Sequence, residues 1–209
     1  MNAPLKLWNL GPSPNSKKVR LALGLKGVPF ETVAVDPMDR AKIVEISGQP
    51  LTPVLTHGDT VVFDSGAILR YLDANVKGGP KLFSADYDEM KKIEVWEAWS
   101  KSDLAPHVST IFGQYFAEKK DPSLVTKANA GLNAAAKRLE GDLGEGNWLV
   151  GGRPTAADIC CASWFSLALL SPEAATSHPI LGFFSESLKL DPERQKLRKW
   201  YQAIDQHDR

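Results

Sequence analysis

Short strand-like and helical patterns alternate in the N-terminal part of the chain. Residues 5–10 and 28–35 are largely apolar runs of strand length. Between them, apolar side chains recur at helical spacing, which predicts a helix over residues 14–26 that stops at Gly27. A strand, a helix and a second strand in this order predict a βαβ unit with parallel strands, because such crossovers are right-handed.

A hairpin and another helix follow. The apolar residues 54–56 and 61–63 flank a turn that contains Gly58, which predicts two antiparallel strands. A helical pattern then covers residues 64–72, and residues 76–80 contain two glycines and a proline without periodicity. We therefore place a boundary near residue 80, with one domain over residues 1–80 and a second over residues 81–209.

The second domain has a helical pattern. Residues 155–170 are apolar on nearly all sides, so this helix should lie at the domain centre, and Thr155 and Asp158 suit a capping box at its start. Prolines and a glycine break the pattern over residues 171–191. We interpret Trp96 and Trp99 as core residues. The other predicted helices cover residues 90–115, with a kink at Pro106, then residues 124–143 and 197–204.

Charge and cysteine content exclude several classes of protein. Lys and Arg number 25, and so do Asp and Glu, and this balance argues against a nucleic-acid partner. No apolar stretch reaches the ~20 residues of a membrane span, and no secretory leader is visible, so we expect a cytoplasmic protein. Cys160 and Cys161 are adjacent in an apolar run, so we expect buried packing residues, no disulfide framework and no metal site.

The turn before the first helix is the first candidate for chemistry. Ser13 is a favoured N-cap residue and Pro14 a favoured first helical residue. The unpaired N–H groups and the positive dipole end of a helix start favour an anion and depress the pKa of a thiol held nearby. Together with Asn15, this turn can therefore stabilise a thiolate that a ligand brings. Plain N-capping by Ser13 is the alternative.

Four segments together resemble a known family. Residues 13–16, 51–55, 64–72 and 147–159 are similar, in this order, to motifs of cytosolic glutathione transferases, of the bacterial serine type close to the nu, zeta and phi classes. The resemblance implies an α/β thioredoxin-like N-terminal domain and an all-α C-terminal domain. It also implies an enzyme that binds glutathione, stabilises its thiolate and conjugates it to an electrophile.

The resemblance assigns roles around the glutathione sulfur. Ser13 matches the residue that hydrogen-bonds the sulfur, Asn15 matches a position with a similar role in some bacterial members, and Ser16 is a possible substitute in the same turn. Two serines stand where thioredoxin-fold oxidoreductases carry two cysteines, which excludes a dithiol cycle here. Thr52 offers its backbone to the cysteinyl part, and Pro53 is expected to follow a cis peptide bond.

The resemblance also assigns the glutamyl end. Asp64 and Ser65 match the pair that holds the α-amino and α-carboxylate groups, although Asp64 is shorter than the usual Glu or Gln, and capping is the alternative for both. Leu51 stands where the family has a polar residue, so Lys42 or Gln49 would have to supply the corresponding polar group.

An electrophile site and a partner are implied as well. The family places its hydrophobic site between the two domains and assembles as a homodimer, and no metal is implied. Two alternatives remain open, namely a catalytically idle scaffold or regulator and a glutathione-dependent isomerase, disulfide reductase or peroxidase. For each candidate of the hydrophobic site, core packing is the competing interpretation; the candidates are Trp8, Leu10, Pro12, Phe112, Tyr115 and Phe116.

Overall fold

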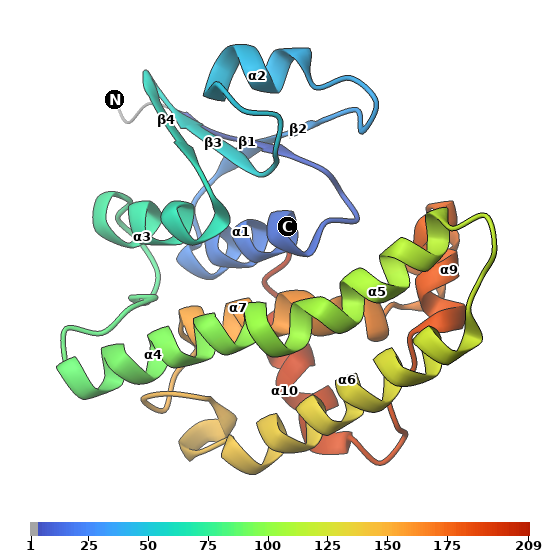
Figure 1. Ribbon diagram of the computed structural model, residues 1–209. Coiled ribbons are helices and arrows are strands. Elements are labelled where there is room, and N and C mark those ends of the chain that lie inside the picture. Colours follow the sequence, from blue (N-terminus) through green and yellow to red (C-terminus); the bar gives the residue numbers. More distant parts are fainter. Residues whose placement is uncertain (1–3) are drawn as a thin grey trace. The chain divides into compact units, whose positions relative to one another are not determined.

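A mixed four-stranded sheet with the order β2-β1-β3-β4 forms the centre of the first unit of the computed structural model, which describes residues 4–209 (Figure 1). β1 pairs in parallel with β2, and β3 pairs antiparallel with β4, as the βαβ unit and the hairpin predict. β1 also pairs antiparallel with β3. The unit runs to Ser84 and also includes His207–Arg209. Its strands are β1 (Leu5–Asn9), β2 (Phe30–Ala34), β3 (Val54–His57) and β4 (Thr60–Phe63).

Three helices cover this sheet. α1 and α3 lie on one face and α2 on the other (Figure 1). The helix predicted over residues 14–26 is confirmed, because Ser13 caps its start and Gly27 ends it at φ 65°. Leu7, Val19 and Ile68 are fully buried and belong to the core of the unit. The helices are α1 (Pro14–Lys26), α2 (Ala41–Ser47) and α3 (Ser65–Asn75).

The second unit, Ala85–Gln206, is built from helices. A π-helical turn, Ser100–Leu104, joins α4 to α5, so the chain passes Pro106 without a break in helical structure. No helix among residues 4–209 is both long and apolar enough to cross a membrane. The helices are α4 (Tyr87–Trp99), α5 (Ala105–Phe116), α6 (Pro122–Asp142), α7 (Ala156–Phe165), α8 (Pro172–Thr176), α9 (Pro179–Ser187) and α10 (Gln195–Asp205), with 3₁₀ turns at Glu145–Asn147 and Ser166–Ala168.

Two predictions for the C-terminal helices are wrong. The helix expected over residues 155–170 ends at Phe165 and continues as a 3₁₀ turn. The segment 171–191, whose prolines and glycine interrupt the helical pattern of the sequence, contains both α8 and α9. Each of these helices has a proline in its first turn, where the missing N–H costs no hydrogen bond, so the prolines start helices here.

Burial of the tryptophans and cysteines agrees with their interpretation as packing residues. Trp96 and Trp99 are buried and meet edge to face, with ring centroids 4.9 Å apart. The Arg138 guanidinium lies 4.8 Å from the Trp99 ring centroid. Cys160 and Cys161 are both buried.

Asp158 organises the start of α7. Its carboxylate accepts hydrogen bonds from the Thr155 N–H at 2.9 Å and the Leu149 N–H at 3.0 Å, and so reaches back to the N-cap as predicted. It also accepts from the Trp200 Nε1–H at 2.9 Å. Burial raises the pKa of Asp158, against the lowering effect of these donors. The carboxylate therefore ties α7, α10 and the preceding loop together.

We expect this carboxylate to dominate the stability of the second unit. Asp158→Ala should leave three buried N–H donors unpaired, whereas Trp200→Phe removes one donor and should cost only about 1–2 kcal/mol of the free energy of unfolding. Urea denaturation followed by circular dichroism checks both. Asp142→Ala, at an exposed carboxylate of α6, is the control. A destabilisation by Asp158→Ala no larger than that by Trp200→Phe would contradict the expectation.

Candidate functional site

The turn between β1 and α1 holds the three residues predicted to act on a thiol. The Ser13 hydroxyl oxygen accepts from the Ser16 N–H at 3.4 Å, and both Ser13 and Asn15 are half-buried. Ser16 is fully buried, and its hydroxyl oxygen accepts from the Leu10 N–H at 3.2 Å. The accessible donors of this turn are therefore the Ser13 hydroxyl and the Asn15 amide.

The start of α3 presents the second pair of predicted residues. Asp64 is the N-cap, and its Oδ1 accepts from the Gly66 N–H at 2.9 Å and the Ala67 N–H at 3.1 Å. The residue adopts φ 67°, ψ 124°, a conformation rare for a non-glycine residue. Among residues 4–209 no hydrogen bond occupies its Oδ2. Asp64 is exposed and Ser65 is buried.

Lys18, which the sequence analysis did not select, joins the two helix starts. It is 1% exposed, and its Nζ donates to the Ser65 Oγ at 3.2 Å and to the Asn15 Oδ1 at 3.3 Å. The Ser65 hydroxyl also donates to the Asn15 Oδ1 at 3.3 Å. The sequence does contain a signal, because Lys18 shares its helix face with the buried Ala22 and Leu25 at spacings of four and seven.

The loop before β3 carries the predicted proline. The Thr52–Pro53 bond is cis, which confirms that prediction. Because β1 and β3 pair Trp8 with Val54, this bond lies beside the end of β1, where the turn to α1 begins. Among residues 4–209 the backbone N–H and C=O of Thr52 form no hydrogen bond, so both remain available.

Gln49 and Lys42, the two polar residues expected to act in place of Leu51, are engaged elsewhere. The Gln49 amide accepts from the Leu51 N–H at 2.7 Å and donates to the Leu51 C=O at 3.0 Å, so it shapes the loop. The Lys42 Nζ pairs with Glu45 at 2.7 Å on the surface. Leu51 itself is 72% exposed.

The candidates for the hydrophobic site fall into two groups. Trp8, Leu10 and Pro12 are half-buried in the first unit. In the second unit, Phe112 is 49% and Phe116 65% exposed, so core packing is the wrong interpretation for these two. Tyr115 contacts Phe116 and Phe183 edge to face within an aromatic cluster. Whether both groups form one site stays a prediction.

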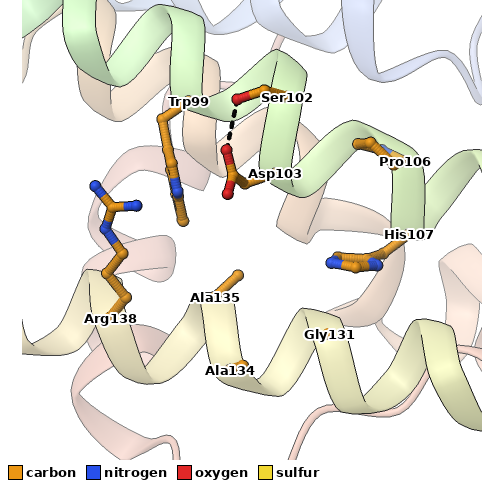
Figure 2. Close-up of a pocket in the computed structure, with 9 residues that line it drawn as sticks. All are labelled: Trp99, Ser102, Asp103, Pro106, His107, Gly131, Ala134, Ala135 and Arg138. Carbon is orange, nitrogen blue, oxygen red and sulfur yellow. Dashed lines mark hydrogen bonds between the residues drawn. The ribbon is translucent and has the colours of Figure 1, made fainter.

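A cavity of about 420 Å³ lies in the second unit, between the π-helical turn with α5 and helix α6 (Figure 2). His107 forms part of its wall, and burial lowers the pKa of this imidazole against the opposing charge of Asp103. His57, in the first unit, is half-buried and hydrogen-bonded to the Tyr71 hydroxyl at 2.9 Å. Gly131 leaves room for the His107 ring, since a Cβ there would overlap it. None of the predicted site residues lines this cavity.

Residues 207–209 support the turn by packing against α1. The Asp208 carboxylate pairs with Arg20 at 2.7 Å and Lys17 at 3.1 Å. The same Arg20 guanidinium donates to the Asn9 Oδ1 at 3.0 Å, at the end of β1. Burial raises the pKa of Asp208, but the hydrogen bond and charge of Arg20 and the charge of Lys17 outweigh it, so the pKa is lowered.

This lowered pKa predicts a pH-dependent stabilisation. The contribution of Asp208 is fully present above its unfolded-state pKa, near 3.8, and is lost as pH falls through the lower folded-state value. Asp208→Asn should therefore lower the urea midpoint most at pH 7, and the difference from wild type should shrink below pH 3.8. Asp59→Asn in the β3–β4 turn is the control. A difference that is constant with pH would contradict the assignment.

The element order and the β2-β1-β3-β4 sheet define a thioredoxin-like unit followed by a helical unit, which is the glutathione transferase architecture. Residues 8–80 match the sequence profile of the glutathione S-transferase N-terminal domain, and residues 122–203 match that of the C-terminal domain. The chain therefore belongs to the glutathione S-transferase family.

Individual relatives agree with this. Glutathione S-transferase 3 of Zea mays is 30% identical over 212 residues, which cover 97% of this chain and 89% of that protein. A maleylpyruvate isomerase of Ralstonia sp is 29% identical over 165 residues, with 74% of this chain and 77% of that protein covered. The crystal structure of glutathione transferase URE2P8 from Phanerochaete chrysosporium, with oxidized glutathione, superposes with a TM-score of 0.77 at 21% identity and covers 98% of this chain and 90% of that one.

Proposed function

We propose that the protein is a glutathione transferase that stabilises the glutathione thiolate and directs it at an electrophile. The observation that carries the proposal is the junction of two helix starts, in which Asn15 and Ser65 are hydrogen-bonded to each other and to Lys18. Two helix N-termini beside one another suit a ligand with two separate anionic groups, such as a thiolate and a carboxylate. A structure with the same fold holds oxidized glutathione, which supports this choice of ligand.

The glutamyl end of glutathione is assigned to the start of α3. The Ser65 N–H donates to its α-carboxylate, beside the Lys18 ammonium, and the unoccupied Oδ2 of Asp64 accepts from its α-amino group. The free backbone N–H and C=O of Thr52 pair with the cysteinyl part as an added strand would. Lys42 and Gln49 would have to leave their present partners to contribute.

The sulfur is assigned to the start of α1. The Ser13 hydroxyl and the Asn15 amide donate hydrogen bonds to it, whereas the buried Ser16 supports the turn. A free thiol with a pKa near 8.5 is only a few per cent ionised at pH 7, so each unit of depression is worth about 1.4 kcal/mol. The thiolate attacks an electrophilic carbon: the carbon–sulfur bond forms as the bond from that carbon to its leaving group breaks, and the thiol proton leaves to solvent.

An isomerase is the second candidate, and the similarity to a maleylpyruvate isomerase favours it. In such a reaction glutathione adds to the substrate and is released again, so it is not consumed. Substrate turnover without loss of free thiol would therefore assign the isomerase, whereas stoichiometric thiol loss assigns the transferase.

Substitutions should separate chemistry from binding. Ser13→Ala and Asn15→Ala should each raise the pKa of the bound thiol and lower kcat at pH 7 by about ten- to a hundredfold, because each removes a hydrogen bond to a charged sulfur. Asp64→Ala should mainly weaken glutathione affinity, because its contact is the same in ground and transition states. Thiolate absorbance against pH and calorimetry with glutathione measure the two effects.

The control for these variants is Cys160→Ala with Cys161→Ala, two buried thiols that should leave activity nearly intact. If wild-type protein binds glutathione without a depressed thiol pKa, and Ser13→Ala and Asn15→Ala change nothing, the protein is a scaffold on this fold. Absence of glutathione binding would overturn the ligand as well.

We also propose a cytoplasmic homodimer, in line with the family resemblance. Apolar side chains that a second copy could cover are exposed in both units, with Phe63 46% exposed on β4 and Val95 54% exposed on α4. Sedimentation equilibrium at micromolar concentration should give twice the monomer mass, and Phe63→Glu should shift the mass toward the monomer. A monomer in wild type would refute the assembly.

A further inference from the structure

We propose that Lys18 is a positioning residue of the glutathione site, which fixes the orientation of the Asn15 amide and the Ser65 hydroxyl before the ligand arrives. The proposal rests on the function proposed above. It goes beyond that function because Lys18 belongs to none of the motifs in the sequence and acts on the ligand through the side chains of Asn15 and Ser65.

The burial of Lys18 is unusual for its residue type. Its side chain is 1% exposed, and among residues 4–209 no carboxylate forms an ion pair with it. Its Nζ is bonded instead to the neutral Asn15 and Ser65. Burying an ammonium without a counter-charge is costly, and an anionic ligand at Ser65 would offset that cost.

The donor and acceptor pattern explains how Lys18 acts. An ammonium only donates, so the Asn15 oxygen must face Lys18, and the Asn15 NH₂ group must face away from it. The Ser65 hydroxyl accepts from Lys18 and donates to the same Asn15 oxygen. If the Asn15 amide were flipped, its NH₂ group would face the Lys18 ammonium and the Ser65 hydroxyl, which are both donors here. Lys18 therefore leaves the Asn15 NH₂ group as the donor available to the ligand sulfur.

Replacing Lys18 by a neutral residue should remove the constraint on the orientation of the Asn15 amide. Lys18→Met keeps the length of the side chain but removes its donors and charge, so the Asn15 amide becomes free to flip. We expect the pKa of the bound thiol to rise, kcat at pH 7 to fall about tenfold, and glutathione affinity to weaken, since Ser65 loses its neighbouring charge. Lys18→Arg, which keeps donors and charge, should recover part of the loss.

A double-mutant cycle distinguishes positioning from a general structural role. If Lys18 acts on the sulfur through Asn15, Lys18→Met should change the thiol pKa little once Asn15→Ala is present. Additive effects on the thiol pKa would overturn the proposal. Lys6→Met, which removes a cation of β1 that pairs with Glu31, is the control and should leave the thiol pKa unchanged.

A measurement without ligand keeps the proposal separate from the proposed function. The side-chain amide of Asn15 should give two distinct, slowly exchanging proton signals in the NMR spectrum of wild-type protein, and these should shift and broaden in Lys18→Met, while circular dichroism shows that the variant is folded. Unchanged Asn15 signals would overturn the role of Lys18. Failure to bind glutathione, with the Asn15 signals changed as expected, would overturn the proposed function alone.

Discussion

The backbone N–H groups at the start of a helix, which the helix itself cannot pair, are the constraint that shapes both units. At the start of α7 the buried Asp158 carboxylate accepts hydrogen bonds from such backbone N–H groups and so stabilises the second unit. Ser13 and Asp64 meet the constraint at α1 and α3 with side chains that solvent reaches. The same physical requirement thus produces a buried hydrogen-bond network in one unit and a candidate ligand site in the other, and the two differ in their access to water.

Those parts of the fold that local rules determine could be predicted from the sequence. Ser13, Pro14 and Gly27 set the limits of α1, and the turn at Gly58 set the hairpin. The helices α8 and α9 could not be predicted in the same way, because a proline stops a helix in its interior and starts one in its first turn. Only the surrounding fold decides between the two.

The candidate site could be predicted only in part, for a similar reason. The capping and proline motifs predict their residues directly, and the cis bond before Pro53 confirms the second of these. Lys18 lies on the apolar face of its helix, but lysine is normally solvated, so the sequence pattern alone is weak evidence of burial, and the packing of α1 against α3 decides it. The sequence also does not show whether the Gln49 amide is available to a ligand, because that depends on its hydrogen bonds to the Leu51 backbone in the same loop.

The packing of residues 207–209 on α1 makes the first unit discontinuous along the chain. A Cβ on Gly24 would overlap the His207 carbonyl oxygen, so the two backbones touch directly. During synthesis, the ion pair between Asp208 and Arg20 of α1 can therefore form only after the whole helical unit, more than a hundred residues, has been translated. The nascent first unit is therefore exposed to chaperones and proteases before the contacts of Asp208 have formed, and a protein made of residues 4–84 alone would lack the same contacts.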